Sequence, residues 1–489
     1  MRLFDTNVQE LKYRVLREIV RLEHAGQLES KLATIPKTIV PGPKATMRCC
    51  IYHERAIVEE RVRIAMGGDT SDSCPVEVID IACDECPTRR FFVTDLCRGC
   101  IAHRCHAACP AGAISFENHK AVIDSNKCLE CGKCMKVCPY GAINETQRPC
   151  IRGCKAGAIS LDEERKARID SEKCVGCGTC VYQCPFGAIV DKSYIIDLLR
   201  MLRESQDGKK FKVYAAIAPS IVSQFSYARI GQIVSGIKQA GFHSVVEVAL
   251  GADITAAKEA KEFCEKDFLL SSCCPSFVKY VEINYPGLAE NISTTASPMV
   301  EIAKLIKSTD PDAKVVFIGP CVSKKSEFRL EKTGGAVDCV ITFEELQALF
   351  DGLDIDVESL SDGELDNASY YGRIFARTGG VSAALEHVVN ESGGGKKVKA
   401  EVCDGLEQCR IALLKAGHGR LDANFIEGMA CEGGCVGGAA CLSHGPKSKS
   451  DVDNYARQAL ESDVRGALKV FGSLAGAPDA PRSDPQSVR

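Results

Sequence analysis

The sequence predicts an α/β domain over about residues 210–446, preceded over 81–195 by small α+β units. After about residue 210, short apolar runs rich in β-branched residues alternate with helical patterns, which is typical of α/β architecture. Before it, the block Cys-(Pro or Lys)-x-Gly-Ala-Ile recurs four times, which indicates an internal duplication. The apolar runs lie at 213–218, 245–249, 315–318 and 337–341, two helical patterns lie at 222–240 and 297–307, and the block starts at Cys109, Cys138, Cys154 and Cys184.

The two ends of the chain carry helical patterns to which no chemistry can be assigned. Residues 1–80 begin with an apolar stripe on one helical face, which is more often a packing face than a functional one. Residues 447–489 should hold one helix and, from about 474, a tail rich in Pro, Ala and charge that we expect to be disordered. The stripe consists of Leu11, Val15, Ile19 and Leu22.

Composition excludes several classes of protein. The 61 basic and 65 acidic residues nearly balance, so the sequence favours neither nucleic acid nor a membrane as a partner. The first residues lack the apolar core of a secretory signal, and no apolar run approaches the ~18 residues that a membrane span requires. The 29 cysteines therefore indicate a reduced, metal-loaded cytoplasmic protein rather than a disulfide-rich secreted one.

The duplicated region has cysteine spacings that suit iron–sulfur clusters. Two runs have the form C-x2-C-x2-C-x3-C-P, and a third repeats it with a two-residue expansion. Zinc is a poorer alternative, because three cysteines at this spacing cap one face of a cubane. Each half of the duplication resembles a bacterial two-cluster ferredoxin. The runs are Cys128, Cys131, Cys134 and Cys138; Cys174, Cys177, Cys180 and Cys184; and, expanded, Cys97, Cys100, Cys105 and Cys109.

The second half of the duplication departs from this pattern. Its first run keeps only Cys150 and Cys154, with Lys155 in place of the usual proline, while Cys83 and Cys86 form a separate pair upstream. The cysteines suffice for four clusters, unless the incomplete half-site is empty and the upstream pair are buried thiols. In this motif the fourth cysteine binds the partner cluster. The expected sets are Cys97, Cys100, Cys105 and Cys138; Cys128, Cys131, Cys134 and Cys109; Cys174, Cys177, Cys180 and Cys154; and, by elimination, Cys83, Cys86, Cys150 and Cys184.

Three short segments in the α/β region place further cysteines on turns built from Pro, Gly or Ser. They read Ser-Ser-Cys-Cys-Pro-Ser-Phe at 271–277, Gly-Pro-Cys-Val-Ser-Lys-Lys-Ser-Glu at 319–327 and Gly-Met-Ala-Cys-Glu-Gly-Gly-Cys at 428–435. Together they resemble the three cluster-binding signatures of the [FeFe]-hydrogenases; the alternative is structural cysteines. The resemblance implies a two-lobed iron hydrogenase fold.

The resemblance also implies an H-cluster. Its 4Fe–4S cubane would be held by four cysteines, of which Cys435 would bridge to a di-iron subsite that carries CO, cyanide and a dithiolate. Because a single protein thiolate binds that subsite in this family, the surrounding residues must hold it by shape, hydrogen bonds and charge. The cubane ligands would be Cys274, Cys321, Cys431 and Cys435.

Several residues match positions around the di-iron subsite in the family. Lys324 stands where the family places a lysine on one cyanide, unless it is a solvated surface lysine. Pro219 and Ser220 resemble the segment that contacts the other cyanide. Ser297 and Met429 would be further elements of the pocket.

Hydrogen chemistry also needs a path for protons to a buried metal. Cys273 matches the proton-donating cysteine of the family, since a thiol can donate and accept a proton. Glu259, Glu262, Ser293 and Glu327 fall at plausible positions for the rest of the relay. For Glu259 and Glu262 the alternative is an exposed charge on a helix.

Three residues differ from the best-known members of the family. Gly319 stands in place of Met, Phe277 in place of Trp and Met299 in place of Gln. All three would lie near the metal site, so they should alter packing and hydrogen bonding around it. They indicate a divergent branch.

The sequence thus predicts a cytoplasmic ferredoxin hydrogenase that interconverts protons, electrons and dihydrogen. Electrons would come from a ferredoxin or a similar low-potential carrier through three to four accessory 4Fe–4S clusters, and maturation proteins would assemble the H-cluster. Two alternatives are a hydrogen-sensing regulator with low turnover, and an iron–sulfur electron-transfer or assembly protein without the di-iron subsite. Cys273 and Lys324 favour the enzyme.

The remaining cysteines have no assigned role and are expected to be free thiols. They are Cys49, Cys50, Cys74, Cys264, Cys339, Cys403, Cys409 and Cys441.

Overall fold

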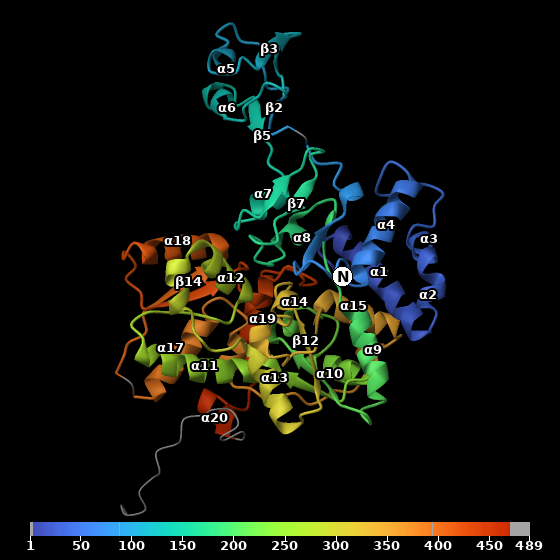
Figure 1. Ribbon diagram of the computed structural model, residues 1–489, viewed down its shortest axis with the longest axis vertical. Coiled ribbons are helices and arrows are strands. Elements are labelled where there is room, and N and C mark those ends of the chain that lie inside the picture. Colours follow the sequence, from blue (N-terminus) through green and yellow to red (C-terminus); the bar gives the residue numbers. More distant parts are fainter. Residues whose placement is uncertain (1–2, 88, 394, 470–489) are drawn as a thin grey trace, which may run out of the picture.

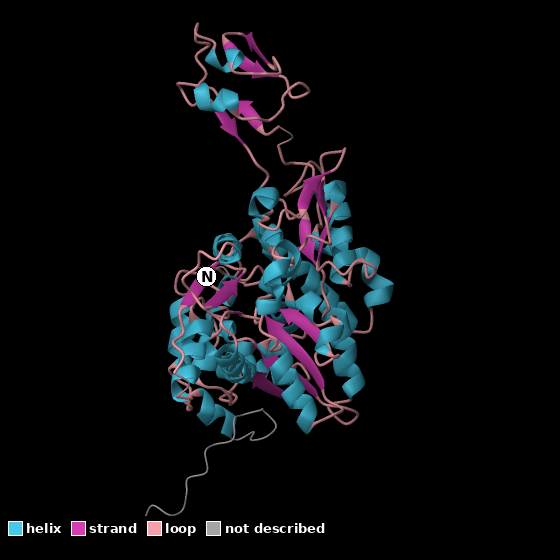
Figure 2. Ribbon diagram, turned by 60° about the vertical axis from the view of Figure 1, so that its left-hand side comes forward, coloured by secondary structure: helices cyan, strands magenta, loops and turns pink. Residues whose placement is uncertain are grey.

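A computed structural model describes residues 3–87, 89–393 and 395–469 (Figure 1). The C-terminal part contains two parallel sheets among many helices, which confirms the predicted α/β architecture (Figure 2). The expected disordered tail from about 474 lies outside the described residues. Within them, no helix combines the length and apolar character that crossing a bilayer requires.

The larger sheet has four parallel strands in the order β10-β9-β12-β13. Strands β9 and β12 are neighbours although β10 lies between them in sequence, so the connections after β9 and β12 leave the sheet in opposite directions. This is a topological switch point, where loops at the carboxyl ends of parallel strands leave room for a ligand. The strands are β9 (Val213–Ile217), β10 (Ser244–Glu247), β12 (Lys314–Gly319) and β13 (Cys339–Thr342).

A second sheet of three parallel strands has the order β11-β15-β14. Its strands are not evident from the sequence. Strand β11 has only two residues, and β15 interrupts its apolar pattern with Glu427 and Gly428. The strands are β11 (Leu269–Leu270), β14 (Ala400–Asp404) and β15 (Phe425–Met429).

Helices surround both sheets. The helical pattern at 297–307 is confirmed by α13, whereas the pattern at 222–240 is confirmed only in its second half, where α10 begins at Ile230. The buried Gln224 accepts the Leu442 N–H at 2.7 Å, which fixes an irregular stretch before α10. The helices are α9 (Ile195–Ser205), α10 (Ile230–Gln239), α11 (Val248–Glu265), α12 (Pro275–Asn284), α13 (Pro298–Thr309), α14 (Lys324–Glu327), α15 (Phe343–Gly352), α16 (Tyr370–Ile374), α17 (Gly380–Glu391), α18 (Leu406–Gly417), α19 (Ser448–Ala456) and α20 (Val464–Lys469).

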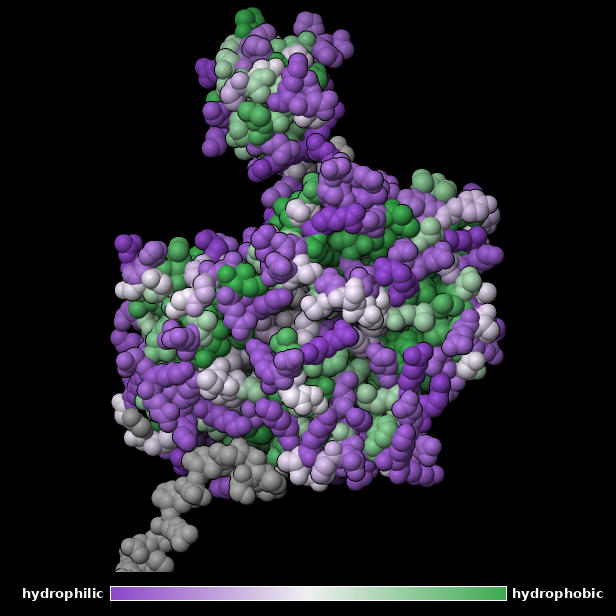
Figure 3. Space-filling view, in the orientation of Figure 1, coloured by the Kyte–Doolittle hydropathy of each residue, from purple (hydrophilic) through white to green (hydrophobic). Residues whose placement is uncertain are grey.

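The cysteine-rich region consists of short antiparallel strand pairs and one-turn helices. One part of it, with β2 to β5, projects from the rest of the molecule (Figure 3). The strand pairs are β1 (Val76–Val78) with β8 (Ile189–Asp191), β2 (Phe91–Val93) with β5 (Ile143–Glu145), β3 (Ile114–Glu117) with β4 (Lys120–Ile123), and β6 (Ile159–Leu161) with β7 (Ala167–Ile169). The helices are α5 (Arg104–Ala107), α6 (Lys133–Val137), α7 (Pro149–Gly153) and α8 (Thr179–Gln183).

The repeated block Cys-x-x-Gly-Ala has a structural reason at all four sites. Its glycine adopts a positive φ of 56–65°, which favours glycine. The chain therefore turns back, and the buried alanine donates its backbone N–H to the sulfur of the cysteine four residues earlier, at 3.3–3.4 Å. The residue directly after the cysteine takes no part in this hydrogen bond. Lys155 can therefore replace proline at that position. The donors are Ala113, Ala142, Ala158 and Ala188.

The N-terminal segment packs against the α/β region. Helix α1 begins after Thr6, whose side chain forms a capping box with Gln9. All four residues of the predicted stripe are buried in a core that also holds Phe343 and Leu346 of α15, so the prediction of a packing face is confirmed. The helices here are α1 (Asn7–His24), α2 (Leu28–Lys31), α3 (Ile35–Ile39) and α4 (Ile51–Ala65).

Candidate active site

A largely apolar cavity lies at the carboxyl ends of strands from both sheets. Each of the three cysteine segments found in the sequence follows one strand. Cys273 and Cys274 follow β11, Cys321 follows β12, and Cys431 follows β15. Parallel strands thus bring together residues that are more than 150 positions apart in the sequence.

Four predicted cubane ligands line this cavity: Cys274, Cys321, Cys431 and Cys435. Burial raises the pKa of Cys321 to about 12, with Cys274 and Cys435 adding to the effect. Burial likewise raises the pKa of Cys435 to about 11, beside Cys274. The four sulfurs are therefore close neighbours.

The polar groups at the cavity fit an anionic or hydrogen-bond-accepting ligand. Lys324 is buried and lines the cavity; its Nζ donates to Ser297 at 2.8 Å and to Glu327 at 2.5 Å. An ammonium has three N–H donors, so one is left for a ligand. Ser220 is not among the residues that line the cavity, although its neighbour Pro219 is; it is fully buried, and its Oγ has no hydrogen-bond partner among the described residues.

The other predicted pocket residues lie either on the wall of the cavity or beside Lys324. Pro219 and Met429 line the cavity together with Lys324. Ser297 precedes α13 and faces Lys324, so it orients the lysine. The solvated-lysine alternative does not apply, because Lys324 is only 7% exposed.

A series of proton-carrying groups leads from the cavity into α11. Cys273 lines the cavity near Glu259, and burial beside Glu259 and Cys274 raises the pKa of its thiol. Glu259 Oε1 accepts the Ser272 N–H at 3.1 Å, while Glu259 Oε2 has no hydrogen-bond partner in the described part of the chain. Burial, with help from Glu262, raises the pKa of Glu259 to about 7.

The series continues to the molecular surface. Ser293 lies close enough to Glu259 to stabilise its ionised form, and Ser293 Oγ donates to Glu262 Oε2 at 2.7 Å. Ser293 and Glu262 both line a surface cleft of about 1960 Å³. The structure thus brings four of the five predicted relay residues together. Glu327 lies apart from this series, beside Lys324.

The three residues that depart from the family pattern are all packed closely around the site. Gly319 leaves space that the Phe317 ring fills, since a Cβ there would lie 2.5 Å from that ring. Phe317 and Met299 line the cavity. The Phe277 ring covers Gly428 at the end of β15, where a Cβ would lie 2.3 Å from the ring.

The first two accessory sets gather in the projecting part. The Cys105 sulfur lies near Cys100 and Cys138, and the Cys134 sulfur lies near Cys128 and Cys109. The fourth cysteine of each run therefore faces the partner run, as the ferredoxin resemblance implies. A small cavity is lined by all four members of the second set, Cys109, Cys128, Cys131 and Cys134.

The other two sets lie closer to the cavity. Cys177 and Cys180 are near Cys154, and Cys177 also lines the cavity beside Cys274. Burial raises the pKa of the Cys150 thiol to about 11, with contributions from Cys184, Cys86 and Cys83. The four cysteines that were assigned by elimination, Cys83, Cys86, Cys150 and Cys184, therefore lie close together. Their role as ligands stays a prediction. In the described ranges, no group of three or more His, Cys, Asp or Glu side chains is arranged around a single metal ion.

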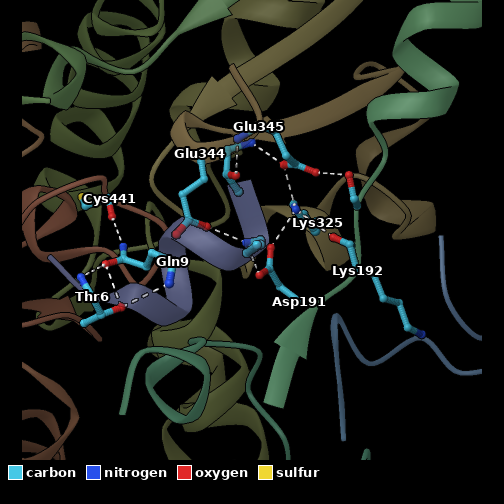
Figure 4. Close-up of polar contacts among 11 residues, drawn as sticks. Thr6, Gln9, Asp191, Lys192, Lys325, Glu344, Glu345 and Cys441 are labelled. Carbon is cyan, nitrogen blue, oxygen red and sulfur yellow. Dashed lines mark hydrogen bonds and ion pairs between the residues drawn. The ribbon is translucent and has the colours of Figure 1, made fainter. Parts of the chain in front are cut away.

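A buried charge network behind the site was missed by the sequence analysis (Figure 4). Lys325, next to Lys324, binds Asp191 at 2.9 Å and Glu345 at 2.8 Å. Lys12 of α1 binds the same Asp191 and, at 2.5 Å, Glu344. No sequence pattern marks these residues, because they come from four separate segments and look like ordinary surface charges.

Comparisons with known proteins agree with this geometry. Residues 211–439 match the family described as iron only hydrogenase large subunit, C-terminal domain. Residues 96–142 match a 4Fe–4S dicluster domain, and residues 127–187 match a 4Fe–4S double cluster binding domain.

Among individual proteins, the chain is 31% identical to Iron hydrogenase 1 of Clostridium pasteurianum over 68% of its own length and 66% of that protein. It is 31% identical to the Periplasmic [Fe] hydrogenase large subunit of Nitratidesulfovibrio vulgaris over 65% of its own length and 86% of that protein. Over 28% of the chain, and 32% of the relative, it is 33% identical to Cytosolic Fe-S cluster assembly factor NAR1 of Eremothecium gossypii. With the catalytic-domain match, the coverage and the cysteine geometry in agreement, the chain belongs to the iron-only, or [FeFe]-, hydrogenase family.

Proposed function

We propose that this chain is a cytoplasmic [FeFe]-hydrogenase that interconverts two protons, two electrons and dihydrogen at an H-cluster bound in the cavity. The observation that carries the proposal is which other residues line the cavity that contains the four cysteines. The same cavity is lined by a further thiol, Cys273, and by the ammonium of Lys324. A cubane alone would need neither a proton path nor a buried cation.

When bound, the H-cluster would supply the redox chemistry that joins protons and electrons. The chain would hold it through Cys274, Cys321, Cys431 and Cys435. The free N–H of Lys324 and the hydroxyl of Ser220 would bind its anionic ligands, since charge-assisted hydrogen bonds are strong in a dry pocket. The apolar wall that includes Pro219 and Met429 would exclude water.

The protein's own groups would move the protons. Cys273 would hold a proton beside the reacting centre and exchange it with Glu259. Because the pKa of Glu259 is raised to about 7, this carboxyl can both accept and donate near neutral pH. Ser293 and Glu262 would pass the proton on to the surface cleft.

Electrons would enter through the accessory clusters. The projecting part, which would hold the first two, is well placed to meet a ferredoxin or a similar low-potential carrier (Figure 1). The third set includes Cys177, which lines the same cavity as Cys274, so it would deliver electrons to the H-cluster. Dedicated maturation proteins would install the di-iron subsite.

A second candidate function is iron–sulfur cluster assembly, which the similarity to the assembly factor favours. A hydrogen sensor with low turnover is a third. Hydrogen evolution from reduced methyl viologen distinguishes these functions, because only the enzyme turns over rapidly. The assay uses protein that was matured and purified without oxygen.

The matched variants for this assay are Cys273→Ala and Cys264→Ala. The first removes the thiol beside the cavity and should lower turnover by about 100-fold or more. The second removes an exposed thiol of α11 and should leave turnover unchanged. Equal rates for both variants would contradict the role of Cys273, and absent turnover in the unmutated, fully matured protein would favour the sensor or the assembly protein.

A further inference from the structure

Cys74 is one of the cysteines without a role in the proposed mechanism, yet it lies inside a proposed cluster site. It is only 5% exposed and belongs to the buried cluster that also contains Cys150, Cys180 and Cys184. Cys174 packs against the same cluster, and the sulfurs of Cys74 and Cys174 lie near each other. Cys74 also lies near Cys180. Five thiols, rather than four, therefore surround the cluster nearest the proposed H-cluster.

The segment around Cys74 is fixed against the loop that carries Cys174. Asp72 Oδ1 accepts the Cys74 N–H at 2.9 Å, and Asp72 Oδ2 accepts the Ser171 hydroxyl at 2.9 Å. Pro75 packs on Gly176, where a Cβ would lie 3.2 Å from the proline ring. One carboxylate and one ring contact thus hold the two loops at a set spacing.

The other side of this segment is fixed equally well. Lys192 Nζ donates to the carbonyl oxygens of Asp69 at 2.6 Å and Asp72 at 2.7 Å, and its backbone N–H donates to the Pro75 carbonyl at 2.9 Å. Strand β1, which begins at Val76, pairs with β8 directly after the last cysteine run. The position of Cys74 is therefore built into the fold.

Cys74 also has the local features of a cluster ligand in this chain. The backbone N–H of Val76, two residues later, lies near its sulfur, as that of Gly176 lies near the sulfur of Cys174. A proline follows Cys74, as it follows Cys86, Cys109, Cys138, Cys184 and Cys274. Donors aimed at a sulfur stabilise the thiolate that binds iron.

We propose that Cys74 is a fifth thiol of the site formed by Cys154, Cys174, Cys177 and Cys180, and that it can bind the same iron as Cys174. In this exchange the bond from iron to the Cys174 sulfur breaks and a bond from iron to the Cys74 sulfur forms. The thiol proton of Cys74 passes to Cys174, and no electrons are gained or lost. The inference rests on the proposed ligand set for this cluster.

The test compares Cys74→Ala, Cys174→Ala, the double variant Cys74→Ala/Cys174→Ala, and Cys154→Ala in the full chain. Iron and acid-labile sulfide are measured per chain, together with the electron paramagnetic resonance spectrum of the reduced protein. Each of the first two variants should keep the iron content of the unmutated chain. The double variant should lose about four irons, as should Cys154→Ala, which has no spare thiol.

Loss of about four irons in Cys174→Ala alone would overturn the inference, since Cys74 would then have failed to replace it. Unchanged iron in both Cys154→Ala and the double variant would instead overturn the proposed ligand set, and the inference with it. Cys174→Ser repeats the comparison with a side chain of similar volume in case the alanine variant misfolds. Cys403→Ala, which removes a buried thiol paired with Cys409, is the matched control and should keep all the iron.

Discussion

At the scale of single residues, Glu259 is the group on which proton transfer should depend most. It is fully buried, its Oε2 lacks a partner among the described residues, and Cys273 and Ser293 both lie near it. Glu259→Gln should lower hydrogen evolution by about 100-fold or more, because an amide cannot relay a proton. The H-cluster infrared bands should persist, since the metal ligands are untouched.

Glu265→Gln is the control for that measurement. It changes an exposed carboxylate on the same helix, α11, and should leave the rate unchanged. Equal rates for Glu259→Gln and the unmutated protein would mean that protons follow another route.

The raised pKa of Glu259 also predicts how stability depends on pH. The pKa of Glu259 is about 7 in the folded protein and ordinarily 4.5. As pH rises, this carboxyl therefore ionises in the unfolded chain before it ionises in the folded one. The stability contributed by this site is therefore full below about pH 4.5, declines up to about pH 7 and is level above. Glu259→Gln should accordingly be more stable than the unmutated protein at pH 8, by about 1–3 kcal/mol, but not at pH 4.5.

Thermal unfolding of the metal-free proteins at the two pH values measures this difference. Glu262→Gln is the matched control, for which the expected change in stability at pH 8 has the opposite sign. Burial alone would raise the pKa of Glu262, but Lys266 and Ser293 lower it. That variant should therefore lose stability at pH 8. A stability difference for Glu259→Gln that does not change with pH would contradict the assignment.

At the scale of elements, the charge network explains what the N-terminal helix contributes. Burial alone would lower the pKa of Lys12, yet Asp191 and Glu344 raise it, so the lysine stays charged. Burial would raise the pKa of Asp191, but Lys12 and Lys325 hold it below its usual range. Helix α1 is thereby tied to α15 directly and, through Asp191 of β8, to α14, which begins at Lys324 (Figure 4).

Lys12→Met should therefore loosen this part of the molecule. Removing one partner of a buried ion pair costs about 3–5 kcal/mol. If local opening controls cleavage, limited proteolysis within residues 1–65 should become about 100-fold faster or more. Lys37→Met, at an exposed position, is the control. Unchanged proteolysis of Lys12→Met would show that the apolar face of α1 alone holds the helix.

Strands β9, β10, β12 and β13 could be predicted because each is a short apolar run between helices. Strands β14 and β15 could not, since neither reads as a continuous apolar run. The cysteine segments could be predicted because turn residues and cysteine spacing are local. Asp191 with Lys12 and Lys325, and Cys74 with Cys174, depend on the packing of distant segments, which no local pattern encodes.

For the molecule as a whole, the four cysteine sets predict how many accessory clusters the chain holds. Cys150→Ala should remove about four irons and leave the infrared bands of the H-cluster in place, because Cys150 lies among Cys83, Cys86 and Cys184. Cys264→Ala should keep the full iron content. Unchanged iron in Cys150→Ala would mean that the incomplete half-site is empty and that electrons bypass it.

The proposed function requires that the cavity at the strand ends hold an H-cluster that reacts with hydrogen. Infrared spectroscopy of anaerobically matured protein under argon and under hydrogen tests it most directly. We expect sharp CO and cyanide stretching bands that shift when the gas is changed. Absence of these bands from a sample that is fully loaded with iron and properly matured would contradict the claim and leave an iron–sulfur electron carrier.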